Sequence, residues 1–270
     1  MHVQPHSQGS NASSVGGLRS SWRQVTRDAK PDPWSVDSKS FLRIGMYPMP
    51  QLLYLGLFLA LFGSPLLLAF FKSLRFNQFS PVPRLALWGV TAAVLFIAAA
   101  SSEAWRAYFG LEWPTWQSLG LATLATAILF VVLSAYVSLR GKFGAASPKQ
   151  LELQKNLLRL PLGHRCFVVM TAAVTEEVLY RGYAIGVGQH LLGSVGLACV
   201  LSIAAFVLGH LRWGLAHLVP VFVCALVLTL LFTSTQNLWA CIIVHAILDG
   251  VGVLVMPVIA MRRQTAQSTG

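Results

Sequence analysis

Three acidic side chains, Glu176, Glu177 and Asp249, lie inside segments that are otherwise apolar and long enough to cross a membrane. A charged side chain at the centre of a bilayer costs about 2.5–3.5 kcal/mol on insertion scales, so such residues are rarely kept for packing alone. Intramembrane carboxylates are therefore candidates for a functional site. Histidines in the following apolar segments supply the other groups that acid–base chemistry needs.

The first motif is an acidic pair with a basic partner. Glu177 and Arg181 are four residues apart, which places both on one helix face with the glutamate in the favoured N-terminal position. Glu176 is rotated about 100° from Glu177 and has no obvious partner. We expect the guanidinium to keep Glu177 ionised and Glu176 to face a cavity. Such a difference in surroundings gives paired carboxylates separate roles.

Two histidines belong to the later motifs. His210 ends the apolar segment that contains Phe206, and His245 and Asp249 are four residues apart on one face of the last apolar segment. A neutral imidazole accepts a proton or orients a water, and a facing carboxylate fixes which ring nitrogen is protonated. Counted along their helices, these groups are expected to meet between the membrane midplane and the cytoplasmic face.

The elements that must position these groups are membrane-spanning helices. The chain is 55% hydrophobic and 11% charged, whereas soluble domains carry about 25% charged residues. The apolar runs are continuous rather than alternating, which excludes a β-barrel. We therefore predict an all-α, polytopic transmembrane helical bundle with about seven spans. The spans are expected at residues 50–71, 84–100, 118–139, 166–192, 193–210, 216–234 and 237–261.

Composition also divides the chain into segments. We expect a basic, largely disordered N-terminal tail at residues 1–43, because it is rich in Ser, Gly and Pro. Leucines alternate with charged residues at 149–160, which predicts an amphipathic helix at the membrane interface or a solvated loop helix. The other segments are an N-terminal transmembrane scaffold (44–140), a basic loop that holds this helix (141–165), a catalytic transmembrane core (166–261) and a C-terminal tail (262–270).

The net charge of +11 reflects membrane orientation rather than nucleic-acid binding. Of the twenty Lys and Arg residues, only Arg181 and Arg212 fall between Cys166 and Met261, and the others gather in the tail and loops. The positive-inside rule accounts for that pattern and, with seven spans, favours a cytoplasmic C-terminus and an N-terminus on the outside. The four cysteines lack CxxC spacing, so we interpret them as small buried apolar side chains rather than disulfides or zinc ligands.

The three motifs, in this order, resemble the CPBP family. Its members include the type II CAAX prenyl endopeptidases and the bacterial Abi-type (abortive-infection, bacteriocin-immunity) proteins. The motifs are Glu176-Glu177 with Arg181, Phe206 with His210, and His245 with Asp249, so the resemblance covers roughly residues 166–250. It implies an intramembrane endopeptidase whose substrate is a prenylated CAAX-type protein or another membrane-anchored protein or peptide. The short chain and the absence of a eukaryotic retrieval signal favour a bacterial inner membrane.

The resemblance also implies roles for the motif residues. Glu176 is the general base that activates a water, aided by His210, while Glu177 and Arg181 hold the first glutamate and shape the site. In the best-understood branch of the family, the position of Asp249 is Asn, a hydrogen-bond donor.

At that position this chain departs from the pattern. His245 and the residue at 249 would stabilise the oxyanion of the tetrahedral intermediate. An aspartate donates a hydrogen bond only when it is protonated. We therefore expect Asp249 either to orient His245 or to carry a proton.

A metal-dependent mechanism is the first alternative. Carboxylates and imidazoles bind Zn²⁺, relatives have been called metalloproteases, and the ligands here would be Glu176, His210 and His245. The HExxH signature of many zinc proteases is missing. We favour a metal-free glutamic protease without a cofactor.

Two other functions stay open. A bacteriocin-immunity protein would use the same fold to bind a peptide without cleaving it. A proton-coupled transporter would use the Glu and His residues as a relay, although no inverted repeat is visible. The simplest interpretation makes the Glu177–Arg181 pair an internal salt bridge and both motif histidines satisfied interior residues. On every reading the lipid bilayer is a partner and nucleic acid is not.

Overall fold

Helices make up the secondary structure of this chain wherever the computed structural model describes it, at residues 50–76, 80–143, 148–211 and 214–268, and these ranges contain no strand. The predicted tail at 1–43 and Arg212 lie outside the described residues. Among the described residues, five helices are long and apolar enough to cross a membrane. The predicted all-α polytopic bundle is therefore confirmed, while the count of seven spans stays a prediction.

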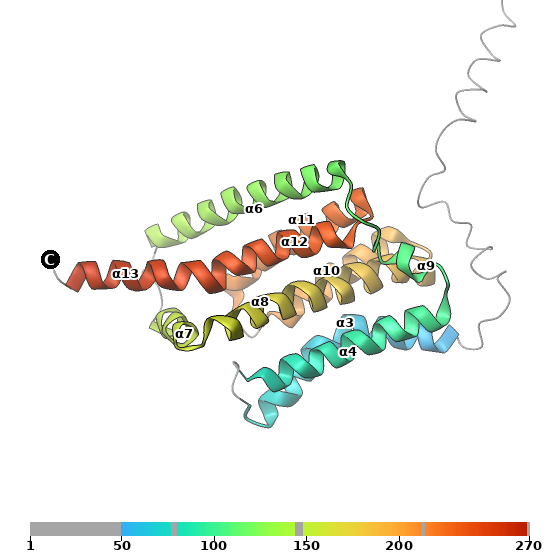
Figure 1. Ribbon diagram of the computed structural model, residues 1–270, viewed down its shortest axis with the longest axis horizontal. Coiled ribbons are helices and arrows are strands. Elements are labelled where there is room, and N and C mark those ends of the chain that lie inside the picture. Colours follow the sequence, from blue (N-terminus) through green and yellow to red (C-terminus); the bar gives the residue numbers. More distant parts are fainter. Residues whose placement is uncertain (1–49, 77–79, 144–147, 212–213, 269–270) are drawn as a thin grey trace, which may run out of the picture. The chain divides into compact units, whose positions relative to one another are not determined.

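The N-terminal helices begin and end at recognisable signals. The Ser80 hydroxyl caps the second long helix by accepting a hydrogen bond from the backbone N–H of Val82, and Pro81 occupies its first position. The helices are α3 (Pro50–Ser73), α4 (Pro81–Ser101), α5 (Trp105–Tyr108), α6 (Trp116–Phe143) and α7 (Pro148–Arg159). Helices α3 and α4 pack side by side (Figure 1).

The C-terminal helices carry all three motifs. Ser194 and Asn237 cap two of them by accepting hydrogen bonds from the backbone N–H groups of Leu197 and Ala240. The elements are α8 (Leu162–Glu177), the π-helix η1 (Val178–Val187), α9 (Gly188–Leu192), α10 (Val195–Gly209), α11 (Leu215–Thr235), α12 (Leu238–Gly250), the π-helix η3 (Val251–Val255) and α13 (Met256–Ser268).

Two of these helices change from α to π geometry next to the acidic residues of the motifs. The segment predicted as the span 166–192 is one run of α8, η1 and α9, and it becomes π-helical right after Glu177. The last predicted span becomes π-helical at Val251, two residues after Asp249. Short π-helical segments occur frequently at functional sites.

The core of the bundle is built around η1. All ten of its residues are buried, and α3, α4, α5, α10 and α12 pack against it. Side chains fix it further: the Tyr183 hydroxyl donates to the Leu53 carbonyl at 3.0 Å, and the Ser202 hydroxyl donates to the Tyr180 carbonyl at 2.8 Å. Among the described residues, the stretch that contains Arg181 is therefore buried along its whole length.

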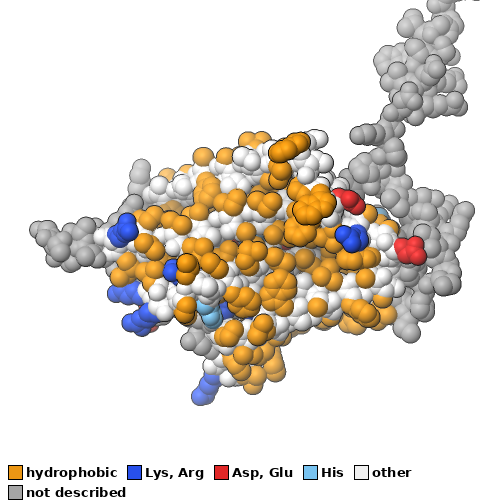
Figure 2. Space-filling view, in the orientation of Figure 1, with side chains coloured by type: hydrophobic (Ala, Val, Ile, Leu, Met, Phe, Trp, Pro, Cys, Tyr) orange, Lys and Arg blue, Asp and Glu red, His pale blue; other side chains and the backbone are white. Residues whose placement is uncertain are grey.

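The outer surface fits a lipid environment. Large apolar side chains such as Phe96 and Val131 are 74% and 70% exposed. Figure 2 shows hydrophobic side chains across the visible face, with most Lys and Arg side chains at the end where α7 and α13 lie in Figure 1. Helix α7 is seen end-on there and packs against α13, so it runs across the bundle. A helix thus exists where the amphipathic one was predicted, and its interfacial position stays a prediction.

Candidate active site

Glu177 is the centre of the motif residues. Its Oε1 accepts a hydrogen bond from Arg181 Nη1 at 2.8 Å and is 2.7 Å from His245 Nδ1. The side chains of Glu177, Arg181 and His245 are 0%, 1% and 9% exposed. A carboxylate only accepts hydrogen bonds, so Nδ1 of His245 carries the proton in this contact. The ion pair expected from the spacing of Glu177 and Arg181 is present, and the histidine is an additional partner.

The Arg181 guanidinium is held on two further sides. Its Nη2 donates to the carbonyl of Ala225 on α11 at 3.2 Å, and its Cζ lies 4.9 Å from the centre of the Phe206 ring, a cation–π contact. Two buried atoms of the pair, Arg181 Nε and Glu177 Oε2, have no hydrogen-bond partner among the described residues. Buried polar atoms of this kind are usually satisfied by an ordered water.

Glu176 and Asp249 face the other nitrogen of His245. Nε2 lies 3.9 Å from Glu176 Oε2 and 3.7 Å from Asp249 Oδ2. Both distances exceed a direct hydrogen bond, and polar groups at such separations are often bridged by water. The side chains of Glu176 and Asp249 are 17% and 38% exposed. The adjacent glutamates therefore differ in surroundings: Glu177 is enclosed and paired, and Glu176 is partly open.

His210 reaches the site from the end of α10. Its Nδ1 is 2.8 Å from the carbonyl of Phe206, which can only accept, so in the neutral ring Nε2 is left as a proton acceptor. A protonated His210 would interact electrostatically with Glu176. The Phe206 ring packs against the rings of His210 and Tyr180, with centroid distances of 4.8 and 5.1 Å. Its centroid lies 6.5 Å from that of the His245 ring. Phe206 thus packs against residues of all three motifs.

The structure brings the six predicted site residues to one place between α8, η1, α10 and α12. Their catalytic roles stay predictions. The zinc ligands considered from the sequence, Glu176, His210 and His245, do not form a group of three potential ligands in the part of the chain that the structure describes. Metal dependence likewise stays a prediction.

Some residues of the site were not identified from the sequence. Ser202 binds the Tyr180 carbonyl beside the motif, and the Ala225 carbonyl binds Arg181. Ser202 is four residues before Phe206 and thus on the same helix face, a signal that sequence reasoning could have used. A backbone carbonyl such as that of Ala225 leaves no sequence signal. His217 also interacts electrostatically with His210 and Asp249, so it lies near the open side.

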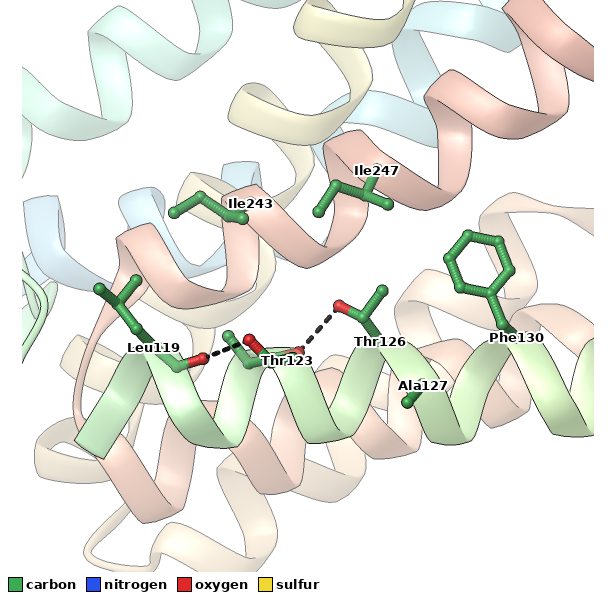
Figure 3. Close-up of a pocket in the computed structure, with 8 residues that line it drawn as sticks. Leu119, Thr123, Thr126, Ala127, Phe130, Ile243 and Ile247 are labelled. Carbon is green, nitrogen blue, oxygen red and sulfur yellow. Dashed lines mark hydrogen bonds between the residues drawn. The ribbon is translucent and has the colours of Figure 1, made fainter. Parts of the chain in front are cut away.

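An apolar groove of about 570 Å³ lies between α6 and α12, away from these residues (Figure 3). Ile243 and Ile247 border it, each two positions from His245, and a two-residue step turns about 200° around a helix. The hydroxyls of Thr123 and Thr126 donate to carbonyls one turn earlier in α6, so they do not make the groove polar. The groove is therefore on the opposite side of α12 from the motif cluster.

Comparison with known families agrees with this geometry. Residues 159–251 match the family model described as type II CAAX prenyl endopeptidase Rce1-like. This segment is an Rce1-like domain. It runs from the last residue of α7 to the first residue of η3 and contains all three motifs. The family resemblance inferred from the motifs is therefore confirmed, whereas comparisons with curated proteins and with solved structures give no match.

Proposed function

We propose that this protein is an intramembrane endopeptidase that hydrolyses a peptide bond in a prenylated CAAX-type protein or another membrane-anchored protein. The observation that carries the proposal is the contrast between two adjacent glutamates. Glu177 is enclosed and bonded to Arg181 and His245, whereas Glu176 is partly open and 3.9 Å from His245 Nε2. The Rce1-like domain covers both residues and supports a peptidase.

In this mechanism Glu176 acts on a water rather than on the substrate. Its carboxylate takes a proton from a water bound between it and His210, whose Nε2 accepts a second hydrogen bond from the same water. The resulting hydroxide attacks the scissile carbonyl carbon, and the carbonyl oxygen takes up the negative charge. The proton held by Glu176 then passes to the leaving amine nitrogen as the carbon–nitrogen bond breaks.

His245 is the group suited to stabilise the oxyanion. Because Nδ1–H is directed at Glu177, Nε2 carries a proton only in the imidazolium form, which the buried carboxylate of Glu177 stabilises. An Nε2–H on the open side can then donate to the oxyanion. Asp249, 3.7 Å from Nε2, helps to hold that proton and to orient the ring. An ionised aspartate can accept a hydrogen bond from Nε2–H, whereas it cannot donate one to the oxyanion.

No step of this mechanism requires a metal. We expect cleavage to persist after exhaustive dialysis of the purified protein against EDTA. Loss of cleavage that added Zn²⁺ restores would contradict the metal-free mechanism and would point to Glu176, His210 and His245 as ligands. The metal content of the active protein, measured by mass spectrometry, decides between the two cases.

The central test compares wild type with Glu176→Gln in a membrane host, with cleavage of a prenylated CAAX-type peptide as the readout. The substitution keeps the size of the side chain and removes the base, so cleavage should fall about 10²–10⁴-fold. Glu103→Gln is a matched control, because it removes an exposed carboxylate outside the motif cluster.

The precursor that accumulates with Glu176→Gln also identifies the natural substrate. Equal membrane abundance of the variants, measured by immunoblot, excludes loss of protein as the explanation. Undiminished cleavage by Glu176→Gln would refute the proposal, and binding of a peptide without hydrolysis would then be the function to test.

A further inference from the structure

A short stretch outside the Rce1-like domain contacts both helices that carry the acidic motifs. This stretch, residues 104–112, connects α4 to α6 and includes α5; we call it the 104–112 connector. The sequence gives it no motif and little apolar pattern. It nevertheless packs against η1 on one side and is hydrogen-bonded to the start of α12 on the other.

The contact with η1 depends on two glycines. Phe109 is fully buried, and a Cβ at Gly182, the residue after Arg181, would overlap its ring. A Cβ at Gly186 would overlap the carbonyl oxygen of Tyr108. The Phe109 ring also packs edge-on against Tyr183 at 6.0 Å. The backbone of η1 therefore rests directly on the connector, and any larger residue at 182 or 186 would push the two apart.

The contact with α12 is made by hydrogen bonds to three successive carbonyls. The carbonyls of Gly110, Leu111 and Glu112 accept, in that order, from the Leu238 backbone N–H at 2.9 Å, Trp239 Nε1 at 3.4 Å and Asn237 Nδ2 at 2.8 Å. Gly110 has a positive φ of 66°, and a Cβ there would overlap the Gln236 carbonyl. Only glycine fits this position without strain.

These contacts lie close in sequence to the residues whose relative position defines the site. Leu238 is seven residues, about two turns, before His245 on α12, and Gly182 directly follows Arg181. Because helices are stiff along their axes, a shift at the connector moves Glu177 and His245 relative to each other. The 2.7 Å contact between Glu177 Oε1 and His245 Nδ1 tolerates only a small displacement.

We propose that the 104–112 connector is a positioning element that sets the axial register of η1 against α12 and so maintains the Glu177–His245 hydrogen bond. In this proposal none of its residues takes part in the reaction itself. This inference rests on the proposed function for its effect on rate, but the hydrogen bond itself is measurable without activity.

The first variant tests the contact with η1. Gly182→Ala should lower kcat for a prenylated peptide by about 100-fold with little change in KM, because a displacement of about 1 Å can cost that much in rate. Adding Phe109→Val makes room for the new methyl group and should restore most of kcat. Gly120→Ala is the matched control, because no atom lies within 4 Å of a Cβ at that position in α6.

The second variant breaks only the contact with α12. Asn237→Ser keeps a side-chain oxygen that caps α12 and removes the donor to the Glu112 carbonyl. We expect a smaller loss of kcat than for Gly182→Ala, with the unfolding temperature close to that of the control. This variant keeps the proposal testable if Gly182→Ala fails to fold.

Proton NMR of protein with ¹⁵N-labelled histidine supplies the readout that does not need activity. The Nδ1–H of His245 bound to a carboxylate should give a downfield signal, assigned by its loss in Glu177→Gln. The signal should weaken in Gly182→Ala and return with Phe109→Val.

An unchanged signal in folded Gly182→Ala and Asn237→Ser would overturn the proposal and leave the connector a purely structural role. If Glu176→Gln retains cleavage, the proposed function fails, yet the NMR result still decides whether the connector positions His245.

Discussion

The two π-helical segments of the described residues both begin one or two residues after an acidic side chain of the motifs, yet they differ in burial. Every residue of η1 is buried, and none of η3 is. Segment η1 is held by hydrogen bonds and by close packing from α3, α5 and α10, whereas η3 continues directly into α13. Glu177, beside η1, is therefore fully enclosed, whereas Asp249, beside η3, is partly exposed.

The same difference divides the candidate site into two halves. The enclosed half is Glu177 with Arg181 and the Nδ1 side of His245, joined by contacts of 2.7 and 2.8 Å. The open half is Glu176, Asp249 and the Nε2 side of His245, where the separations are 3.7 and 3.9 Å. A hydrolase needs both: a rigid part that aligns the groups, and a part that a water and a substrate can enter.

The largest expected effect comes from breaking the enclosed half. Arg181→Met leaves the Glu177 carboxylate buried without its cation, so we expect the free energy of unfolding to fall by about 3–5 kcal/mol. Denaturation in detergent measures the change. Arg106→Met, at an exposed position, is the control and should change stability by less than about 0.5 kcal/mol. A loss below about 1 kcal/mol for Arg181→Met would mean that water reaches the pair.

A second comparison separates stability from activity at the two glutamates. Glu177→Gln removes the carboxylate that two buried partners share, so it should lose about 1–3 kcal/mol of stability together with activity. Glu176→Gln has no short contact to lose and should stay within about 0.5 kcal/mol of wild type while cleavage falls. Thermal unfolding and peptide cleavage, measured on the same preparations, test both statements. Equal destabilisation by the two substitutions would refute the division into halves.

The sequence was sufficient for those parts of the site that depend on local spacing. The Glu177–Arg181 pair follows from an i, i+4 step on a helix, and the membrane class follows from continuous apolar runs. The Glu177–His245 contact joins residues 68 positions apart, so no periodicity could predict it. The π geometry of η1 was also not predicted, because a continuous apolar run does not distinguish an α-helix from a π-helix. The 104–112 connector was missed because it acts through backbone carbonyls and the absence of side chains at glycines.

A smaller effect is expected at the outer support of η1. Ser202→Ala removes the hydroxyl that donates to the buried Tyr180 carbonyl at 2.8 Å, and the loss should be about 1 kcal/mol. Thr123→Val in α6 is a suitable control, because that hydroxyl donates within its own helix at an exposed position. Chemical denaturation of the two variants gives the comparison. If Thr123→Val lowers the free energy of unfolding as much as Ser202→Ala does, the hydrogen bond to η1 contributes no more to stability than a hydrogen bond within an exposed helix.

The smallest effect is expected in the open half. Asp249 is 38% exposed and 3.7 Å from His245, so Asp249→Asn should leave the free energy of unfolding nearly unchanged. The amide oxygen of asparagine can still accept a hydrogen bond from Nε2–H of His245, so cleavage should stay close to that of wild type. Asp249→Ala keeps neither the negative charge nor a side-chain hydrogen-bonding group, so it should lower kcat, though by less than Glu176→Gln. Steady-state kinetics of the three variants decides the role of Asp249: if Asp249→Asn is as inactive as Asp249→Ala, the negative charge that orients His245 is essential, and hydrogen bonding alone is not sufficient.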